Sequence, residues 1–198
     1  MKRMLKRLSG VAFGVMLLCA SAFGQSTSLT PGVKPSPEVA TTTKADEAVM
    51  IKAEAEKSSR AFLSGDFNKV LDSTYPRIIE LGGGKAKLIA SMEAGMKEIR
   101  DLGLKIVSHT VGEPEKTVRA GTMLVAVVPT TLKMESTDTL FTQRSFWLAV
   151  STDDGKTWTF LDGSYLNKES MKIVLPEAVD KITLPGVEQP VMERKPAG

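Results

Sequence analysis

Hydrophobic side chains recur at helical spacing through the first half of this chain. The clearest pattern covers residues 85–102, where apolar positions fall three or four residues apart along one face: Leu88, Met92, Met96 and Ile99. This spacing is typical of an amphipathic helix that packs one face against a core. Residues 45–63 show a similar period, with two acidic residues in the first turn, where they favour the helix dipole. Both segments are predicted to be helices.

The sequence between these two helices contains signals that stop and start helices. Gly65 is a stop signal, and Asp66 is a candidate N-cap for a short helix over the residues that follow. Pro76 and the glycines at 82–84 then predict breaks. We therefore expect several helices separated by tight turns.

The second half of the chain changes to the period of β-strands. Four strands are predicted, at residues 104–111, 123–134, 140–151 and 157–161. In the third strand Phe146 and Leu148 alternate with Trp147 and Ala149, so both faces of that strand are apolar. Pro129 predicts an edge position or a bulge in the second strand, because proline has no backbone N–H to donate.

The stretch STDDGKTW at residues 151–158 joins the last two predicted strands. Its spacing of Ser, Asp, Gly, Thr and Trp resembles the Asp box that repeats around the propellers of sialidases. A propeller needs several repeated blades, whereas this chain has one copy of the box and no repeat at such a period. We therefore interpret the stretch as a tight β-hairpin, with Asp-Asp-Gly at the turn and Trp158 in the core.

The order of the elements predicts the α+β class, because helices come first, antiparallel strands follow, and a short helix at residues 167–174 closes the domain. We expect N-terminal helices packed on a curved antiparallel sheet of about four strands. In this arrangement the chain resembles the nuclear transport factor 2-like (cystatin-like) superfamily, in particular small exported bacterial members with no assigned activity. Four segments carry the resemblance: FLSGDFNKVLDSTYP (62–76), GGGKAKLIASMEAGMKEI (82–99), VAVVPTTLKM (125–134) and FWLAVSTDDGKTWTFLDGS (146–164).

The resemblance implies a cone-shaped domain whose mouth, between the helices and the sheet, is the ligand site. It also implies a homodimer formed through the sheet. Members of the superfamily include isomerases, cyclases, dehydratases and proteins that only bind or assemble, so the fold does not choose a function.

The N-terminus has the pattern of a signal peptide over residues 1–24. Basic residues precede an apolar run that is too short for a comfortable membrane span. We expect export to the periplasm or the extracellular space, a mature chain that starts near Gln25, and no transmembrane helix in it. Cys19 follows Leu18, where a lipoprotein motif requires a small residue, so lipid anchoring is not expected.

The mature chain divides into three parts. Residues 25–43 are rich in Ser, Thr and Pro and are expected to form a disordered tether. A single α+β domain is expected over 44–183, followed by a flexible C-terminal tail over 184–198. The stretch GVEQPVMERKPAG (186–198) in this tail contains two prolines and glycine and shows no periodicity.

Charge and composition narrow the possible ligands. Most of the formal net charge of +3 belongs to the leader, and the mature chain has no basic stripe of the kind that nucleic acids need. The chain has one histidine, and its one cysteine lies in the leader, so neither a metal site nor a cofactor is expected.

Four candidate pocket residues come from the break after the short helix and from the end of the last strand: Tyr75, Arg77, Glu80 and Asp162. The resemblance places the first three near the mouth of the cone. For Arg77 and Glu80 an ordinary helix surface is the favoured alternative.

Two further candidates lie on predicted strands. His109 could act as a general base, but a single histidine among alternating strand residues is more typical of the surface, which we favour. Arg144 shares the alternation of Phe146 and is expected to point toward the apolar face. There it would be a buried charge paired with an acid such as Glu80 or Asp162, or an anchor for a carboxylate ligand. The ion pair is the favoured alternative.

These features predict an exported, non-catalytic protein that binds a small molecule or a peptide, or that has an accessory role. The alternative is a small isomerase, cyclase or hydrolase that uses a carboxylate and Tyr75 or His109 in the cone. A third possibility is an interaction module, which a filled cone and an exposed apolar sheet face would favour.

Overall fold

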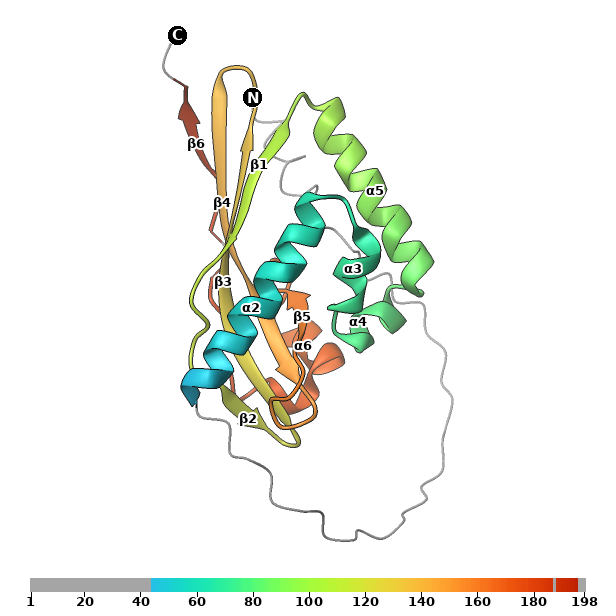
Figure 1. Ribbon diagram of the computed structural model, residues 1–198, viewed down its shortest axis with the longest axis vertical. Coiled ribbons are helices and arrows are strands. Elements are labelled where there is room, and N and C mark those ends of the chain that lie inside the picture. The colour runs from blue at the N-terminus through green and yellow to red at the C-terminus, as the bar shows by residue number, and fades with distance from the viewer. Residues whose placement is uncertain (1–43, 187, 196–198) are drawn as a thin grey trace, which may run out of the picture.

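Among the described residues, four helices precede the long strands, one more than the sequence predicts (Figure 1). The computed structural model describes residues 44–186 and 188–195. The helices are α2 (Lys44–Leu63), α3 (Phe67–Asp72), α4 (Pro76–Leu81) and α5 (Lys85–Asp101). The predicted signal peptide at 1–24, the tether at 25–43 and Cys19 lie outside the described residues.

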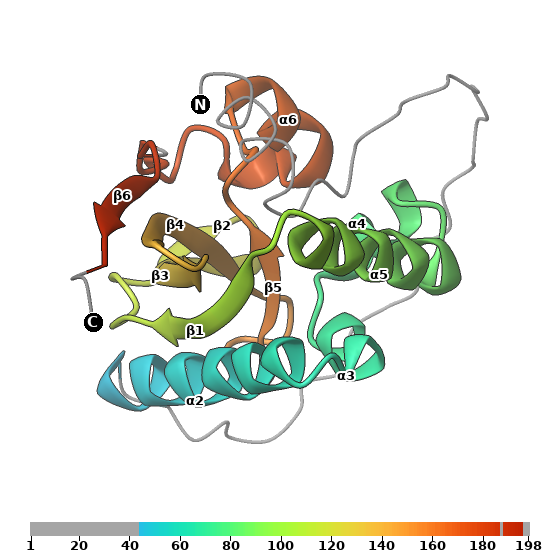
Figure 2. The ribbon, with the colours of Figure 1, turned by 90° about the horizontal axis from the view of Figure 1, so that it is seen from above.

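The strands form one antiparallel sheet that curls into a half-barrel (Figure 2). They are β1 (Lys105–Val111), β2 (Val118–Ala120), β3 (Met123–Glu135), β4 (Thr139–Ser151), β5 (Thr159–Asp162) and β6 (Val191–Arg194). The order across the sheet is β1-β3-β4-β5, while β2 extends the pairing along β3 and β6 the pairing along β4. The predicted α+β class, with N-terminal helices on a curved antiparallel sheet, is confirmed.

The two faces of the sheet contact different helices. The face of β4 that carries Trp147 and Ala149 contacts α2, and we call it the concave face. The opposite face carries Phe146 and Leu148, and we call it the convex face. It packs against α6 (Lys168–Val174) and the short 3-10 helix that follows. Because both faces are covered over residues 146–150, this part of β4 is apolar on both sides.

The predicted hairpin at residues 151–158 is confirmed, with the polar residues of the motif in structural roles. The Asp153 carboxylate accepts hydrogen bonds from the backbone N–H and the hydroxyl of Thr157, at 2.9 and 2.7 Å. The Ser151 hydroxyl donates to Asp153 at 2.7 Å and accepts from the Gly155 N–H at 2.9 Å. Trp158 is 5% exposed, and its indole N–H donates to the Gly155 carbonyl. The box therefore closes the end of the sheet.

Pro129 lies in the middle of β3, which is an inner strand of the sheet. The expected edge position is present only around Pro129 itself, where neither β1 nor β2 pairs with β3. Along β3, the pairing with β2 covers residues 123–125 and the pairing with β1 begins at Thr130, so residues 126–129 lie between the two ladders. Between these ladders the irregular chain at 112–117 lies against β3, where the Pro129 carbonyl accepts from Gly112 N–H at 2.8 Å. The missing N–H of proline is thus tolerated at a gap in the ladder.

Two short elements differ from the sequence expectation. Pro76 begins α4 instead of only breaking the chain, since proline is well suited to the first turn of a helix. The segment 184–198 was expected to be a flexible tail, but it contains β6, which pairs antiparallel with Thr139–Thr142 of β4. All four β6 side chains are exposed, so this strand has no hydrophobic alternation that a sequence pattern could reveal. Among the described residues, no helix is long and apolar enough to cross a membrane.

Candidate functional site

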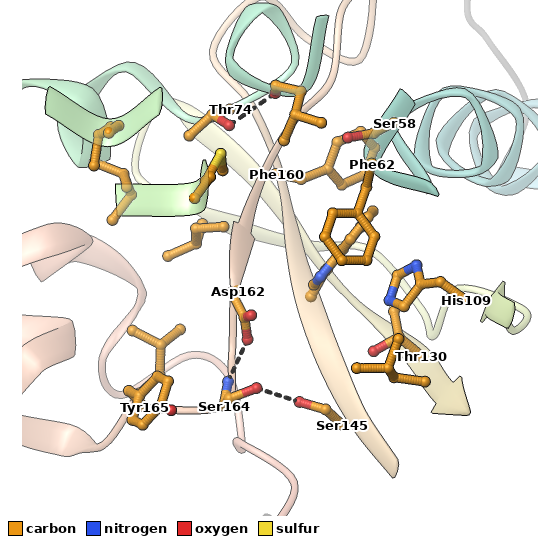
Figure 3. A pocket seen from close by; sticks show the side chains of 18 of the residues that line it. Ser58, Phe62, Thr74, His109, Thr130, Ser145, Phe160, Asp162, Ser164 and Tyr165 are labelled. Carbon is orange, nitrogen blue, oxygen red and sulfur yellow. Dashed lines mark hydrogen bonds between the residues drawn. The ribbon is translucent and has the colours of Figure 1, made fainter. Parts of the chain in front are cut away.

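A cavity of about 520 Å³ lies between the helices and the concave face of the sheet, and it continues around the edge strand β5 to α6 (Figure 3). Helices α2, α3, α4, α5 and α6 and strands β1, β3, β4 and β5 all contribute to its lining. Most of its wall is apolar, including Phe62, Leu71, Ile78, Leu88, Met92, Trp147 and Phe160. This is the position at which the resemblance places the ligand site of the cone.

A row of hydroxyl groups crosses the floor of the cavity. Thr130 on β3 is the register partner of Ser145 on β4, and the Ser145 hydroxyl lies 2.8 Å from the Ser164 hydroxyl. Gly163 allows this approach, because a Cβ atom there would lie 2.2 Å from the Phe146 ring. The Gly163 N–H also donates to the Phe146 carbonyl at 2.8 Å. The chain after β5 therefore returns close to β4 and brings Ser164 to the row.

Asp162 lies beside this row, opposite Trp147 in the β4–β5 register. One oxygen of its carboxyl group accepts a hydrogen bond from the Ser164 N–H at 2.7 Å. Burial raises the pKa of Asp162, and the hydrogen bonds from Ser164 offset only part of this rise. The carboxyl group thus keeps its proton to a higher pH than an exposed aspartate.

His109 lines the opposite side of the cavity, with its ring directed inward from β1 (Figure 3). The imidazole lies 5.1 Å from the Trp147 ring and 5.7 Å from the Phe62 ring, centroid to centroid. Its Nδ1 lies 2.9 Å from the Ser59 hydroxyl. Burial lowers the pKa of His109 to about 4, so the ring is neutral at pH 7. The favoured surface position for His109 was therefore wrong.

Arg144 does not enter the cavity. It shares the face of Phe146, as the alternation predicted, but that face is the convex one, and the Arg144 side chain is 64% exposed. Its partner is Glu188, at 3.4 Å, whereas Glu80 and Asp162 were the acids considered. The buried ion pair expected from the sequence was wrong, because the helical cover of the convex face does not reach this far along β4.

The three candidates around α4 also lie outside the lining of the cavity. Arg77 and Glu80 form an exposed ion pair one helical turn apart, at 3.1 Å, which is the ordinary helix surface that we favoured. The half-buried Tyr75 directs its hydroxyl at the Met123 sulfur, 3.8 Å away. Of the six candidates only His109 and Asp162 line the cavity.

Sequence reasoning missed the small polar residues that line the cavity, which include Thr130, Gln143, Ser145 and Ser164. It also missed the buried Ser59, which contacts His109. A usable signal was present in β4, where Gln143 and Ser145 precede Trp147 on alternate positions. Polar residues on the face that becomes apolar further along a strand indicate a place where the sheet is not packed against a helix.

The cavity offers hydroxyl, amide and imidazole groups and the Asp162 carboxyl group on an apolar wall. None of the described lining residues is Lys or Arg. Within residues 44–186 and 188–195, no three His, Cys, Asp or Glu side chains gather closely enough to hold a metal ion. No family model, curated protein or solved structure matches this chain. The argument for a function therefore rests on the cavity and its lining.

Proposed function

We propose that this chain is an exported, non-catalytic binding protein that holds a small, largely apolar and uncharged molecule in the cavity. The observation that carries the proposal is the cavity of about 520 Å³ on the concave face. Small-molecule sites have volumes of this order, with apolar walls and a few polar groups. Protein interiors that serve packing alone contain few voids larger than a water molecule. The open cavity also argues against an interaction module with a filled cone.

The charges around the cavity support an uncharged ligand. A bound anion would have no Lys or Arg among the described lining residues to neutralise it, and burying an unpaired charge is costly. A bound cation would have Asp162 as its partner, but burial already disfavours the charged form of that carboxyl group. His109, which is neutral at pH 7, adds no charge.

Membership of the nuclear transport factor 2-like superfamily, export and a homodimer are parts of the same proposal. The half-barrel sheet with helices over its concave face supports the superfamily. The leader pattern at residues 1–24 supports export. The resemblance supports the homodimer, which it implies is formed through the sheet.

A small isomerase, cyclase or hydrolase is the second candidate, and one observation favours it. Asp162 and His109 share the cavity, and burial shifts their pKa values in opposite directions, up for the carboxyl group and down for the imidazole. Paired titratable groups with shifted pKa values are typical of acid–base sites. In this alternative, neutral His109 is the base, and Asp162, whose protonated form burial favours, is the acid.

Native mass spectrometry of the chain purified from a bacterial host after export tests the proposal. We expect the mass of a chain that begins near Gln25 and the mass of a dimer of that chain. We also expect a bound small molecule that is released on denaturation. The variant Ser145→Trp, which fills the cavity floor, should lose the small molecule, whereas Arg144→Trp on the convex face should keep it. An empty wild-type protein, or a molecule retained by Ser145→Trp, would contradict binding in the cavity.

The same experiment separates the two candidates. A binding protein holds the same molecule in wild type and in Asp162→Asn, because no bond of the ligand changes. An enzyme accumulates unreacted substrate in Asp162→Asn, so the two proteins would retain molecules of different structure.

A further inference from the structure

The hydrogen bonds around Ser59 constrain the proton on the His109 ring. The Ser59 hydroxyl lies 2.8 Å from the backbone carbonyl of His109 and 2.9 Å from the Nδ1 atom of the same residue. A hydroxyl group has one proton to donate, and a carbonyl oxygen can only accept. The proton of Ser59 therefore points at the carbonyl, and the Ser59 oxygen is left to accept from Nδ1.

We propose that Ser59 is a positioning residue that fixes His109 as the Nδ1–H tautomer, so that Nε2 presents an unprotonated acceptor to the cavity for the hydroxyl group of an uncharged ligand. The ligand class rests on the proposed function, whereas the tautomer does not. In a neutral imidazole one nitrogen carries the proton and the other accepts, and the hydrogen bond of one nitrogen decides the role of the other.

The packing around the ring supports a fixed orientation. Ser59 is 3% exposed on α2, and it reaches β1 across the interface between the helix and the sheet. Trp147 lies tilted at 35° against the imidazole, and Phe62 contacts it edge-on at 77°. These contacts hold the ring between two aromatic side chains while its edge faces the cavity (Figure 3). The neutrality of the ring at pH 7 agrees with this arrangement.

The unprotonated Nε2 atom of His109 determines which apolar molecules the cavity would bind most tightly. A ligand hydroxyl that donates to Nε2 satisfies a polar atom that would otherwise lie against an apolar wall. A ligand without a donor leaves Nε2 unpaired when it displaces water, which carries a desolvation cost. The preference is therefore for an alcohol or a phenol over the corresponding ether or hydrocarbon.

His109 is the only histidine in the sequence, so its ring gives a single pattern in a long-range ¹⁵N–¹H correlation spectrum of the untagged, ¹⁵N-labelled chain. We expect a protonated Nδ1 and an unprotonated Nε2 in the ligand-free protein. Ser59→Ala should move the population toward the Nε2–H form. Ser58→Ala is the matched control, since the neighbouring Ser58 hydroxyl pairs with Ser73 at 2.8 Å and should leave the pattern unchanged. A protonated Nε2 in wild type, or no change in Ser59→Ala, would overturn the tautomer assignment.

The ligand class is tested with 2-naphthol and 2-methoxynaphthalene, which share an apolar ring system but differ in the donor. Followed at the Nε2 signal of His109, 2-naphthol should bind about three- to tenfold more tightly, the range of one buried hydrogen bond. Ser59→Ala should reduce this ratio toward one. Equal binding of the two probes to wild type would overturn the subsite but not the proposed function. Failure of both probes to bind would overturn the subsite and contradict the proposed function.

Discussion

The two faces of β4 place residues of one strand in two different environments. On the convex face Phe146 is 2% exposed and Leu148 is fully buried, and both pack in the cluster that α6 covers. On the concave face the neighbours Ser145 and Trp147 border a cavity of about 520 Å³. The same alternation that builds a filled core on one side leaves an open space with polar groups on the other.

This difference shows where the sheet lacks close packing against the helices. A sheet face that only stabilises the domain is expected to be apolar and closely packed. The concave face follows that rule at its closed end, where Ala149 and Trp158 meet Ile51 and Ala55 of α2. Further along β4 it departs from the rule, with Ser145 and a half-buried imidazole in place of aliphatic side chains. We attribute this departure to ligand binding.

The largest expected effect is a difference in the loss of stability between substitutions on the two faces of β4. Phe146→Ala should lower the free energy of unfolding by about 3–5 kcal/mol, because it opens a cavity in a filled core. Trp147→Ala should cost less, although its side chain is larger, since the indole borders space that is already open. Urea denaturation of both variants measures this. A larger loss for Trp147→Ala would mean that the concave face is packed as tightly as the convex one.

The second effect is the pH dependence of the concave face. The pKa of His109 falls from an ordinary value of 6.5 to about 4 on folding, so the unfolded chain binds a proton before the folded one does. This contribution to stability is complete above pH 6.5 and is lost as the pH falls toward 4, by up to about 3 kcal/mol.

His109→Gln removes that contribution and should reduce the difference in unfolding free energy between pH 7 and pH 4.5. The other titrating groups are common to both proteins and cancel in the comparison. An equal loss of unfolding free energy in wild type and His109→Gln would show that the ring is as exposed as the sequence predicted.

An effect of opposite sign is expected at Asp162. Its pKa is raised on folding, so its contribution to stability is lost as the pH rises through the folded value. Asp162→Asn, which keeps an oxygen for the Ser164 N–H, should therefore raise the melting temperature at pH 7. The gain should disappear at acidic pH, where the wild-type carboxyl group is protonated. A loss of stability at pH 7 would mean that a buried partner stabilises the charged form.

The smallest effect is expected at Arg144 on the exposed part of the convex face. Arg144→Ala removes a solvent-exposed ion pair with Glu188 and should change the free energy of unfolding by less than about 0.5 kcal/mol. Chemical denaturation of the dilute protein measures it. A loss of several times that size would restore the structural role that the sequence suggested for this residue.

The sequence predicted the elements better than the site, and particular residues show why. The spacing of Leu88 and Ile99 is periodic, and periodicity reports burial, so the helix over 85–102 was predicted within a residue of α5. The hairpin at 151–158 was predicted because its turn residues act locally. Strand β6 was missed because its four exposed side chains have no periodic burial.

The site depends on which face of the sheet remains uncovered, and this is not a local property. Arg144 and Ser145 are adjacent, but only the three-dimensional cover of helices determines that one is exposed and the other lines a cavity. His109 was expected at the surface because its strand neighbours alternate, whereas Phe62 of α2 and Trp147 of β4 enclose its ring. Such contacts between distant segments leave no pattern in the sequence.

Binding of an uncharged apolar dye tests the central claim most directly. Nile red, whose emission rises in an apolar environment, should bind wild type and Arg144→Trp with the same affinity. Ser145→Trp on the cavity floor and Met92→Trp on the α5 wall should each weaken binding about tenfold or more by filling the cavity. Unchanged urea midpoints would show that the variants are folded. Equal binding by all four proteins, or a loss confined to Arg144→Trp, would contradict a ligand site on the concave face.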